Sequence, residues 1–60
     1  MNKSDIAPFL NKRIKICLPN GFSYTGRVEE LNETSFVLFD KFGKDLKIAY
    51  SAVALIEAMP

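Results

Sequence analysis

The sequence predicts a mostly β domain, in which a short N-terminal helix precedes five short, strongly bent antiparallel strands that curl into a small barrel. Apolar residues change from helical spacing to strict alternation near residue 14. Glycine-containing turns separate the alternating runs. The chain of 60 residues has room for one domain, which we place at residues 1–60.

The first segment, residues 4–11, is predicted to be a helix of about two turns. Ser4 is the expected N-cap, because serine side chains accept hydrogen bonds from first-turn N–H groups. Pro8 is tolerated only near the helix start, where the N–H groups have no intrahelical partner. The apolar stripe consists of Ile6, Phe9 and Leu10. We expect this stripe to lie on the sheet.

The first two strands are predicted at residues 14–18 and 22–31, joined by a turn with the sequence PNG. In both segments apolar and polar residues alternate, which is typical of half-buried strands. Gly26 interrupts the second segment, and Leu31 is apolar where alternation expects a polar residue. Glycine inside a strand often marks a bend or bulge, so we predict one here.

Three more strands are predicted at residues 35–40, 45–50 and 53–59. Residues 36–39 are continuously apolar, which predicts that both faces of the third strand are covered. The last strand is also too apolar on both faces for an exposed edge. Pairing with another copy of the chain would cover this edge, and head-to-tail pairing closes into a ring when the rotation allows.

The composition favours a globular domain supported by self-association. Hydrophobic residues make up 48% of the chain and charged residues 25%. The lone Cys17 cannot form an internal disulfide, and the absence of histidine argues against a structural zinc site, so no cofactor or metal is predicted. A net charge of +1 argues against bulk coating of DNA. We find neither a signal-peptide pattern nor the run of about 20 apolar residues that a membrane helix needs, and we expect a cytoplasmic protein without a membrane partner.

The order of glycine, aromatic and apolar residues resembles the Sm/LSm superfamily, and within it the Hfq-like RNA-binding proteins of bacteria. Residues 18–28, LPNGFSYTGRV, followed by EELN, are similar to the first Sm motif. Residues 8–11, PFLN, are similar to the start of the Hfq-like domain, and residues 47–53, KIAYSAV, to its C-terminal motif. The resemblance covers nearly the whole chain and implies the five-stranded, SH3-like barrel of the Sm fold.

The resemblance also implies a function: a homo-oligomeric ring of about six or seven subunits that binds single-stranded U-rich or A-rich RNA, with an RNA chaperone or RNA-processing role. The implied pore site consists of Asn32, Thr34, Ser35, Lys47 and Ile48. The implied site on the opposite face consists of Phe22, Tyr24 and Thr25. The implied rim site consists of Lys12, Arg13 and Lys15. The implied subunit interface consists of Tyr50, Ser51, Val53, Leu55 and Ile56.

The chemistry of the implied pore residues predicts a weakened uridine site. Asn32 and Ser35 can hydrogen-bond to base edges, and Lys47 can approach a phosphate. Thr34 has no aromatic face on which a base could stack, and Glu33 would repel phosphate. Stacking on an aromatic ring is worth about 1–3 kcal/mol per base, so the opposite face is expected to favour A-rich RNA if its rings are exposed.

Each of these residues also has a purely structural interpretation. Phe22 and Tyr24 are equally consistent with burial in the core, Asn32 with a role in its turn, and the rim cluster with an ordinary solvated surface. The competing function is a monomeric or dimeric SH3-like module that binds a protein or DNA partner. An enzyme is not expected, because the chain has no histidine and Cys17 has no evident base.

Overall fold

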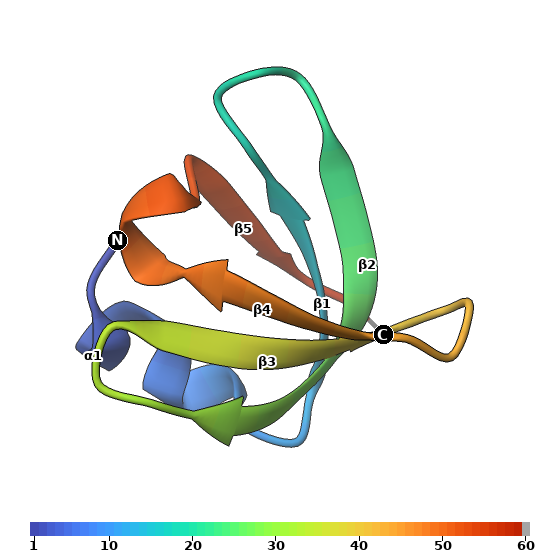
Figure 1. The fold of residues 1–60 in the computed structure, drawn as a ribbon, viewed down its shortest axis with the longest axis horizontal. Coiled ribbons are helices and arrows are strands. Elements are labelled where there is room, and N and C mark those ends of the chain that lie inside the picture. The colour runs from blue at the N-terminus through green and yellow to red at the C-terminus, as the bar shows by residue number, and fades with distance from the viewer. Residues whose placement is uncertain (60) are drawn as a thin grey trace.

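The computed structural model describes residues 1–59 (Figure 1). Its elements, in chain order, are the helix α1 (Lys3–Ile6), the 3-10 helix η1 (Ala7–Phe9), β1 (Arg13–Cys17), β2 (Ser23–Leu31), β3 (Ser35–Asp40), β4 (Asp45–Ala49), the 3-10 helix η2 (Tyr50–Ala52) and β5 (Leu55–Ala58). The strands form one antiparallel sheet in the order β4-β3-β2-β1-β5. The prediction of a helix followed by five antiparallel strands is confirmed.

The sheet is strongly curved and open (Figure 1). Its edges are β4 and β5, and within residues 1–59 no ladder joins them. The predicted closure into a barrel is therefore not present in this part of the chain. One side of each edge strand keeps backbone N–H and C=O groups that no neighbouring strand uses.

The N-terminal helix begins earlier and is shorter than predicted. Its N-cap is Asn2 rather than Ser4, and the Asn2 N–H donates a 2.8 Å hydrogen bond to Asp5 Oδ2. This contact satisfies a backbone group at the helix start. Pro8 lies in the first turn of the 3-10 helix that follows, where its missing N–H leaves no ladder bond broken.

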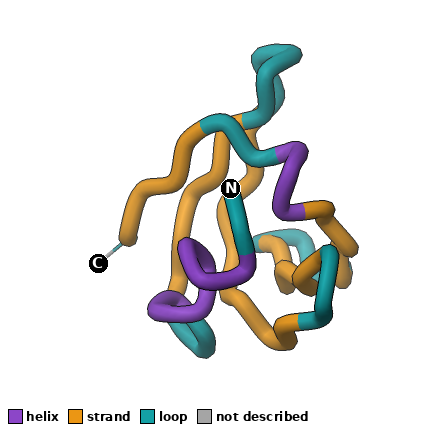
Figure 2. Tube along the Cα trace, turned by 90° about the vertical axis from the view of Figure 1, so that its left-hand side faces the viewer, coloured by secondary structure: helices purple, strands orange, loops and turns teal. Residues whose placement is uncertain are grey.

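Only one residue of the predicted apolar stripe is fully buried. Ile6 is buried in the core and Phe9 packs against it, whereas Leu10 is 40% exposed. The reason is that the helical backbone stops at Phe9: Leu10 is extended, with ψ 130°, and bridges to Val28 of β2. Figure 2 shows the helical turns lying beside the strands.

The alternation of β1 and β2 is borne out, and β2 contains the predicted bulge. The pairing of β2 with β3 skips one residue between Val28 and Glu30. Gly26 is buried where β2 and β3 approach closely, because a Cβ at this position would overlap the carbonyl oxygen of Phe39. Glycine is thus required here by the space between two strands.

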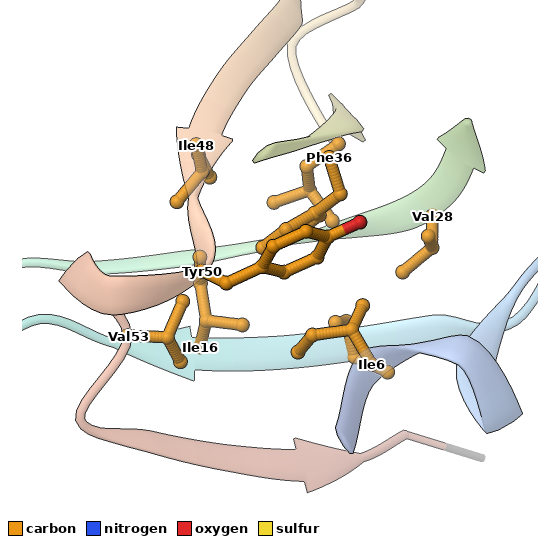
Figure 3. Packing of buried hydrophobic residues seen from close by; sticks show 9 residues of the cluster. Ile6, Ile16, Val28, Phe36, Ile48, Tyr50 and Val53 are labelled. Carbon is orange, nitrogen blue, oxygen red and sulfur yellow. The ribbon is translucent and has the colours of Figure 1, made fainter. Parts of the chain in front are cut away.

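The core lies inside the curved sheet, as the close view in Figure 3 shows. Its centre is an aromatic pair: the rings of Phe36 and Tyr50 stack with their centroids 5.5 Å apart. The remaining buried apolar residues are Ile6, Ile14, Ile16, Val28, Leu38, Ile48 and Val53. They come from the helix, the strands and the segment after η2, so the core depends on all parts of the chain.

The prediction that both faces of β3 are covered is wrong. Phe36 and Leu38 point into the core and are fully buried, but Val37 is half-buried and Phe39 is 39% exposed. Within residues 1–59 no element packs over the outer face of β3, so an apolar run has an exposed side.

The last two strands are shorter than predicted. Tyr50 leaves β4 to begin η2, and Val53 precedes β5 as a buried residue. Their apolar side chains belong to the core rather than to strand pairing. No helix among residues 1–59 has the length and apolar character needed to cross a membrane.

Candidate nucleic-acid interface

The loop of residues 32–34 and the start of η2 lie side by side at one edge of the molecule (left in Figure 1). The Asn32 N–H donates to the Ser35 carbonyl oxygen at 2.8 Å, which closes the turn between β2 and β3. The Tyr50 N–H donates to the Thr34 carbonyl oxygen at 3.1 Å, and the Tyr50 hydroxyl to the Asn32 carbonyl oxygen at 2.7 Å. These contacts bring together loop and strand-end residues that are distant in the sequence.

Exposure divides the five predicted pore residues into two groups. Thr34 and Lys47 are exposed and Asn32 is half-buried, whereas Ser35 and Ile48 are only 6% and 9% exposed. Ile48 is part of the core. The accessible groups are therefore an amide and a hydroxyl in the loop and an ammonium group on β4, which suit hydrogen bonding to base edges and contact with a phosphate.

The hairpin between β1 and β2 carries the most accessible ring of the three predicted opposite-face residues. Phe22 at its tip is 62% exposed, and the Phe22 N–H donates to Asn20 Oδ1 at 3.1 Å, which orders the turn. Tyr24 and Thr25 are half-buried, and Tyr24 packs against the core. Phe22 thus offers a free aromatic face, while Tyr24 has a structural role as well.

A hollow of about 280 Å³ runs beside the β4 edge. Its lining includes Leu18 and Tyr24 from one side and Leu46, Lys47 and Ala52 from the other. Tyr24 and Lys47, which were predicted to belong to opposite faces, border the same hollow. This hollow is largely apolar, with an ammonium group at its margin.

The sequence and the fold can now be set beside those of known proteins. No family model matches the sequence, and no curated protein matches it significantly. A crystal structure of the pleiotropic translational regulator Hfq is similar in fold, with a TM-score of 0.76 over 88% of this chain and 90% of that chain, at 22% sequence identity. This chain has the Sm-like fold of Hfq. The resemblance seen in the sequence is thereby confirmed for the fold.

In this Sm-like chain the predicted interface residues are divided between core and surface. Tyr50 and Val53 are each 4% exposed and belong to the chain's own core. Ile56 is half-buried and packs against that core, whereas Leu55 is 51% exposed and Ser51 is also exposed. A second copy could reach Ser51, Leu55 and part of Ile56 directly.

The predicted rim residues lie on the outer side of β1 and just before it. Lys12 and Arg13 are exposed, and Lys15 is half-buried between Thr25 of β2 and Glu57 of β5, its partners in the ladder. The glutamate beside Lys15 reduces the positive potential there.

A second set of basic residues, not predicted from the sequence, lies on the outer face of the sheet. Arg27 of β2 is the direct ladder partner of Arg13, and both border a pocket with Phe39 and Lys41. The alternation of β2 contained the signal, because it places Arg27 on the same outward face as Thr25. The exposed position of Phe39 had no such signal, since its run is apolar throughout.

Burial raises the pKa of the Tyr50 hydroxyl above its ordinary value of 10.0. A phenol in an apolar environment resists ionisation because the phenolate would lose its hydration. Tyr50 therefore holds the loop of residues 32–34 as a neutral hydrogen-bond donor throughout the physiological pH range.

Proposed function

We propose that the protein is an Sm-like RNA-binding subunit that assembles into a homo-oligomeric ring and binds single-stranded RNA. The observation that carries the proposal is an open Sm-like sheet with two free edges, whose accessible polar groups include Asn32 and Thr34 in the loop after β2 and Lys47 on β4. The similar fold of a translational regulator supports a role that involves RNA. We expect this role to be RNA chaperoning or RNA processing in the cytoplasm.

Ring formation is favoured because each edge strand has backbone groups without a neighbouring strand to pair with. Pairing β5 of one copy with β4 of the next would satisfy the free backbone groups of both edges and continue the sheet from copy to copy around a closed ring. Leu55, 51% exposed on β5, is an apolar side chain that needs cover. The hollow beside β4 has the apolar lining to receive such a side chain. We expect about six or seven subunits, as a closed cyclic assembly.

RNA binding at the proposed pore would be multivalent. Each subunit contributes one Lys47 from β4, together with the amide of Asn32 and the hydroxyl of Thr34 from the loop after β2, and a ring repeats this set around its axis. Identical weak sites held close together raise the effective concentration of each for a bound strand. The exposed carboxylate of Glu33 lies in the same loop and weakens the attraction for phosphate.

The hairpin face is the stronger candidate for A-rich RNA. Phe22 presents an exposed ring, whereas the loop of residues 32–34 has no aromatic side chain. If stacking dominates the affinity for single strands, oligo(A) should bind at least as tightly as oligo(U).

Native mass spectrometry with and without oligo(U) and oligo(A) tests the assembly, and fluorescence anisotropy tests the binding. Lys47→Ala should weaken oligo(U) binding and flatten its salt dependence, because each subunit loses one phosphate contact. The matched control is Lys44→Ala, which removes the same charge from the turn before β4 and should have little effect. A stable monomer that binds neither oligomer would refute the proposal and support the monomeric protein- or DNA-binding module instead.

A second pair of variants compares the two faces. Phe22→Ala should lower oligo(A) affinity by about tenfold and leave the assembly intact, because the side chain projects from a hairpin tip. Leu10→Ala is the control, since Leu10 is an apolar side chain that is 40% exposed and precedes β1 rather than lying in the hairpin after it. An oligo(U) preference that is insensitive to Phe22 would assign RNA binding to the loop edge alone.

A further inference from the structure

A pocket of about 340 Å³ opens on the outer face of the sheet, over β1, β2 and β3. Its lining consists of Arg13, Gly26, Arg27, Phe39, Asp40 and Lys41. We call it the Arg27 pocket. It lies at the end of β3 that is remote from the loop of residues 32–34, so it is separate from the proposed pore site.

The ladder register places three of the lining side chains directly beside one another. Arg13 pairs with Arg27 across β1 and β2, and Arg27 pairs with Phe39 across β2 and β3. Directly opposed residues on one sheet face have Cβ atoms about 5 Å apart. The Lys41 N–H donates to the Thr25 carbonyl oxygen at 3.3 Å, which holds a third cation against the same part of β2. Two guanidinium groups, an ammonium group and an aromatic ring thus border one pocket.

The positive charge of this pocket is incompletely balanced. Like charges directly opposite one another destabilise a sheet, and Arg13 faces Arg27 in this way. Among residues 1–59 the single ion pair joins Arg27 to Glu29, with Nη2 and Oε1 2.9 Å apart. Arg13 and Lys41 have no ion-pair partner in that part of the chain.

The one carboxylate in the lining is already engaged in the adjacent turn. Asp40 is 9% exposed, and its Oδ1 accepts hydrogen bonds from the N–H groups of Phe42 and Lys44, both at 2.9 Å. These bonds hold the carboxylate toward the turn between β3 and β4. The accessible charge in the pocket is therefore positive.

We propose that the Arg27 pocket binds one nucleotide unit of single-stranded RNA, with the base on the Phe39 ring and the phosphate between Arg13, Arg27 and Lys41. Guanidinium groups recognise phosphate through paired N–H donors, and an exposed ring offers a stacking surface to any base. Phe39 is 39% exposed despite its apolar character, which gives the base a ready platform. The proposal rests on the RNA-binding function proposed above and adds Arg27, Phe39 and Lys41 as contacts beside Arg13, which the sequence assigned to the rim.

The charges around the pocket determine the path of the strand. Glu29, Glu30 and Asp45 line a neighbouring hollow with Val37 on the same outer face, and they repel phosphate from that side. The strand therefore continues from the pocket toward the row formed by Lys15 and Thr25. Assembly leaves this path open, because a ring would pair the β4 and β5 edges and not the outer face of β1 to β3.

Equilibrium binding of fluorescein-labelled rA6 and rU6 tests the assignment in a background that carries Lys47→Ala and Phe22→Ala, which removes the two other sites. In this background, Arg27→Gln and Phe39→Leu should each lower the remaining affinity by about tenfold. Arg27→Gln should also reduce the steepness of the salt dependence. The charge control is Lys44→Gln, which makes the same change in the adjacent turn and should leave the affinity unchanged. Phe42→Leu is unsuitable as a control, because Lys41 Nζ lies over the Phe42 ring, 5.4 Å from its centroid.

Glu29→Gln separates binding from a structural role of Arg27. It removes the same ion pair as Arg27→Gln but releases the guanidinium and deletes a negative charge, so RNA affinity should rise about threefold or more. A loss of affinity in both variants would assign Arg27 to the structure of the strand and overturn the proposal.

Three further outcomes would overturn the proposal, and they differ in what they imply for the proposed function. If the otherwise unsubstituted protein binds RNA, but Arg27→Gln and Phe39→Leu change nothing in either background, the pocket is not an RNA site and the function stands. If the unsubstituted protein binds no RNA, both fail together. An oligo-glutamate peptide that competes as strongly as rA6 would assign the pocket to acidic proteins instead.

Discussion

The Tyr50 hydroxyl donates a 2.7 Å hydrogen bond to the carbonyl oxygen of Asn32, and this bond ties the 3-10 helix after β4 to the loop after β2. Tyr50 is 4% exposed and its ring stacks on Phe36, so one residue belongs both to the core and to the edge where the proposed pore site lies. A change in core packing is thereby transmitted to the candidate binding loop.

Replacing Tyr50 with phenylalanine should lower the free energy of unfolding by about 1 kcal/mol, because the ring packing remains while the Asn32 carbonyl loses its partner. Chemical denaturation with a two-state fit measures the change. The control is Tyr24→Phe, since the Tyr24 hydroxyl makes no hydrogen bond within residues 1–59. Equal losses in both variants would show that the Tyr50 hydroxyl contributes nothing specific.

The raised pKa of Tyr50 predicts that stability falls at alkaline pH. Tyrosine in the unfolded chain ionises near 10.0, whereas burial keeps folded Tyr50 protonated to a higher pH. Between these two values the unfolded state binds fewer protons, so the contribution of Tyr50 is fully present below pH 10 and is lost as the pH rises through the folded pKa. Unfolding free energies from about pH 8 to pH 12 should show a decline that is shallower in Tyr50→Phe; an identical decline would contradict the assignment.

Gly26→Ala should be strongly destabilising, by about 3 kcal/mol, because the new methyl group would overlap the Phe39 carbonyl and force β2 and β3 apart. Gly43→Ala is the matched control: its φ of +81° strains an alanine, but no atom lies within 4 Å of the added Cβ. That strain costs about 1–2 kcal/mol. Thermal unfolding of the two variants separates steric overlap from backbone strain, and a milder effect at Gly26 would contradict the close approach.

Leu55→Lys should convert the proposed ring into smaller species, while each subunit keeps its own folded sheet. Leu55 is 51% exposed, so it contributes to an interface more than to the chain's own core. Leu10→Lys introduces the same change at a residue that is 40% exposed and bridges to Val28 of β2, the middle strand of the sheet, rather than to an edge strand. Native mass spectrometry compares the two; an intact ring in Leu55→Lys would show that β5 does not pair in the way proposed.

The strands were predictable from the sequence because alternation is a local property with a period of two. The alternating segments became β1 and β2, and the bulge near Val28 followed from the break in alternation at Leu31. The bounds of β3 agree with the predicted residues 35–40, although that strand was predicted from its continuous apolar run. The first and last residues of the helix were harder to predict. The choice of Asn2 over Ser4 as the N-cap depends on the contact with Asp5, and either residue satisfies the local rule.

The candidate sites were harder to predict because they depend on contacts between distant segments. Nothing local in the sequence indicates that Tyr50 reaches Asn32, or that Tyr24 and Lys47 border one hollow. The exposure of Phe39 could not be predicted from the sequence, for a different reason. A continuous apolar run indicates two covered faces only when a second layer is present, and within residues 1–59 none covers the outer side of β3.

The strand order β4-β3-β2-β1-β5 implies a sequence of events during folding. The pairings of β1 with β2, β2 with β3 and β3 with β4 each join neighbours in the chain, whereas the pairing of β1 with β5 closes a loop that contains the three other strands. Local hairpins cost less loop-closure entropy than such a distant contact. We therefore expect the meander of β1 to β4 to form first and β5 to dock last and detach first. Native-state hydrogen exchange should show the amide protons of Leu55–Ala58 opening before those of β2 and β3.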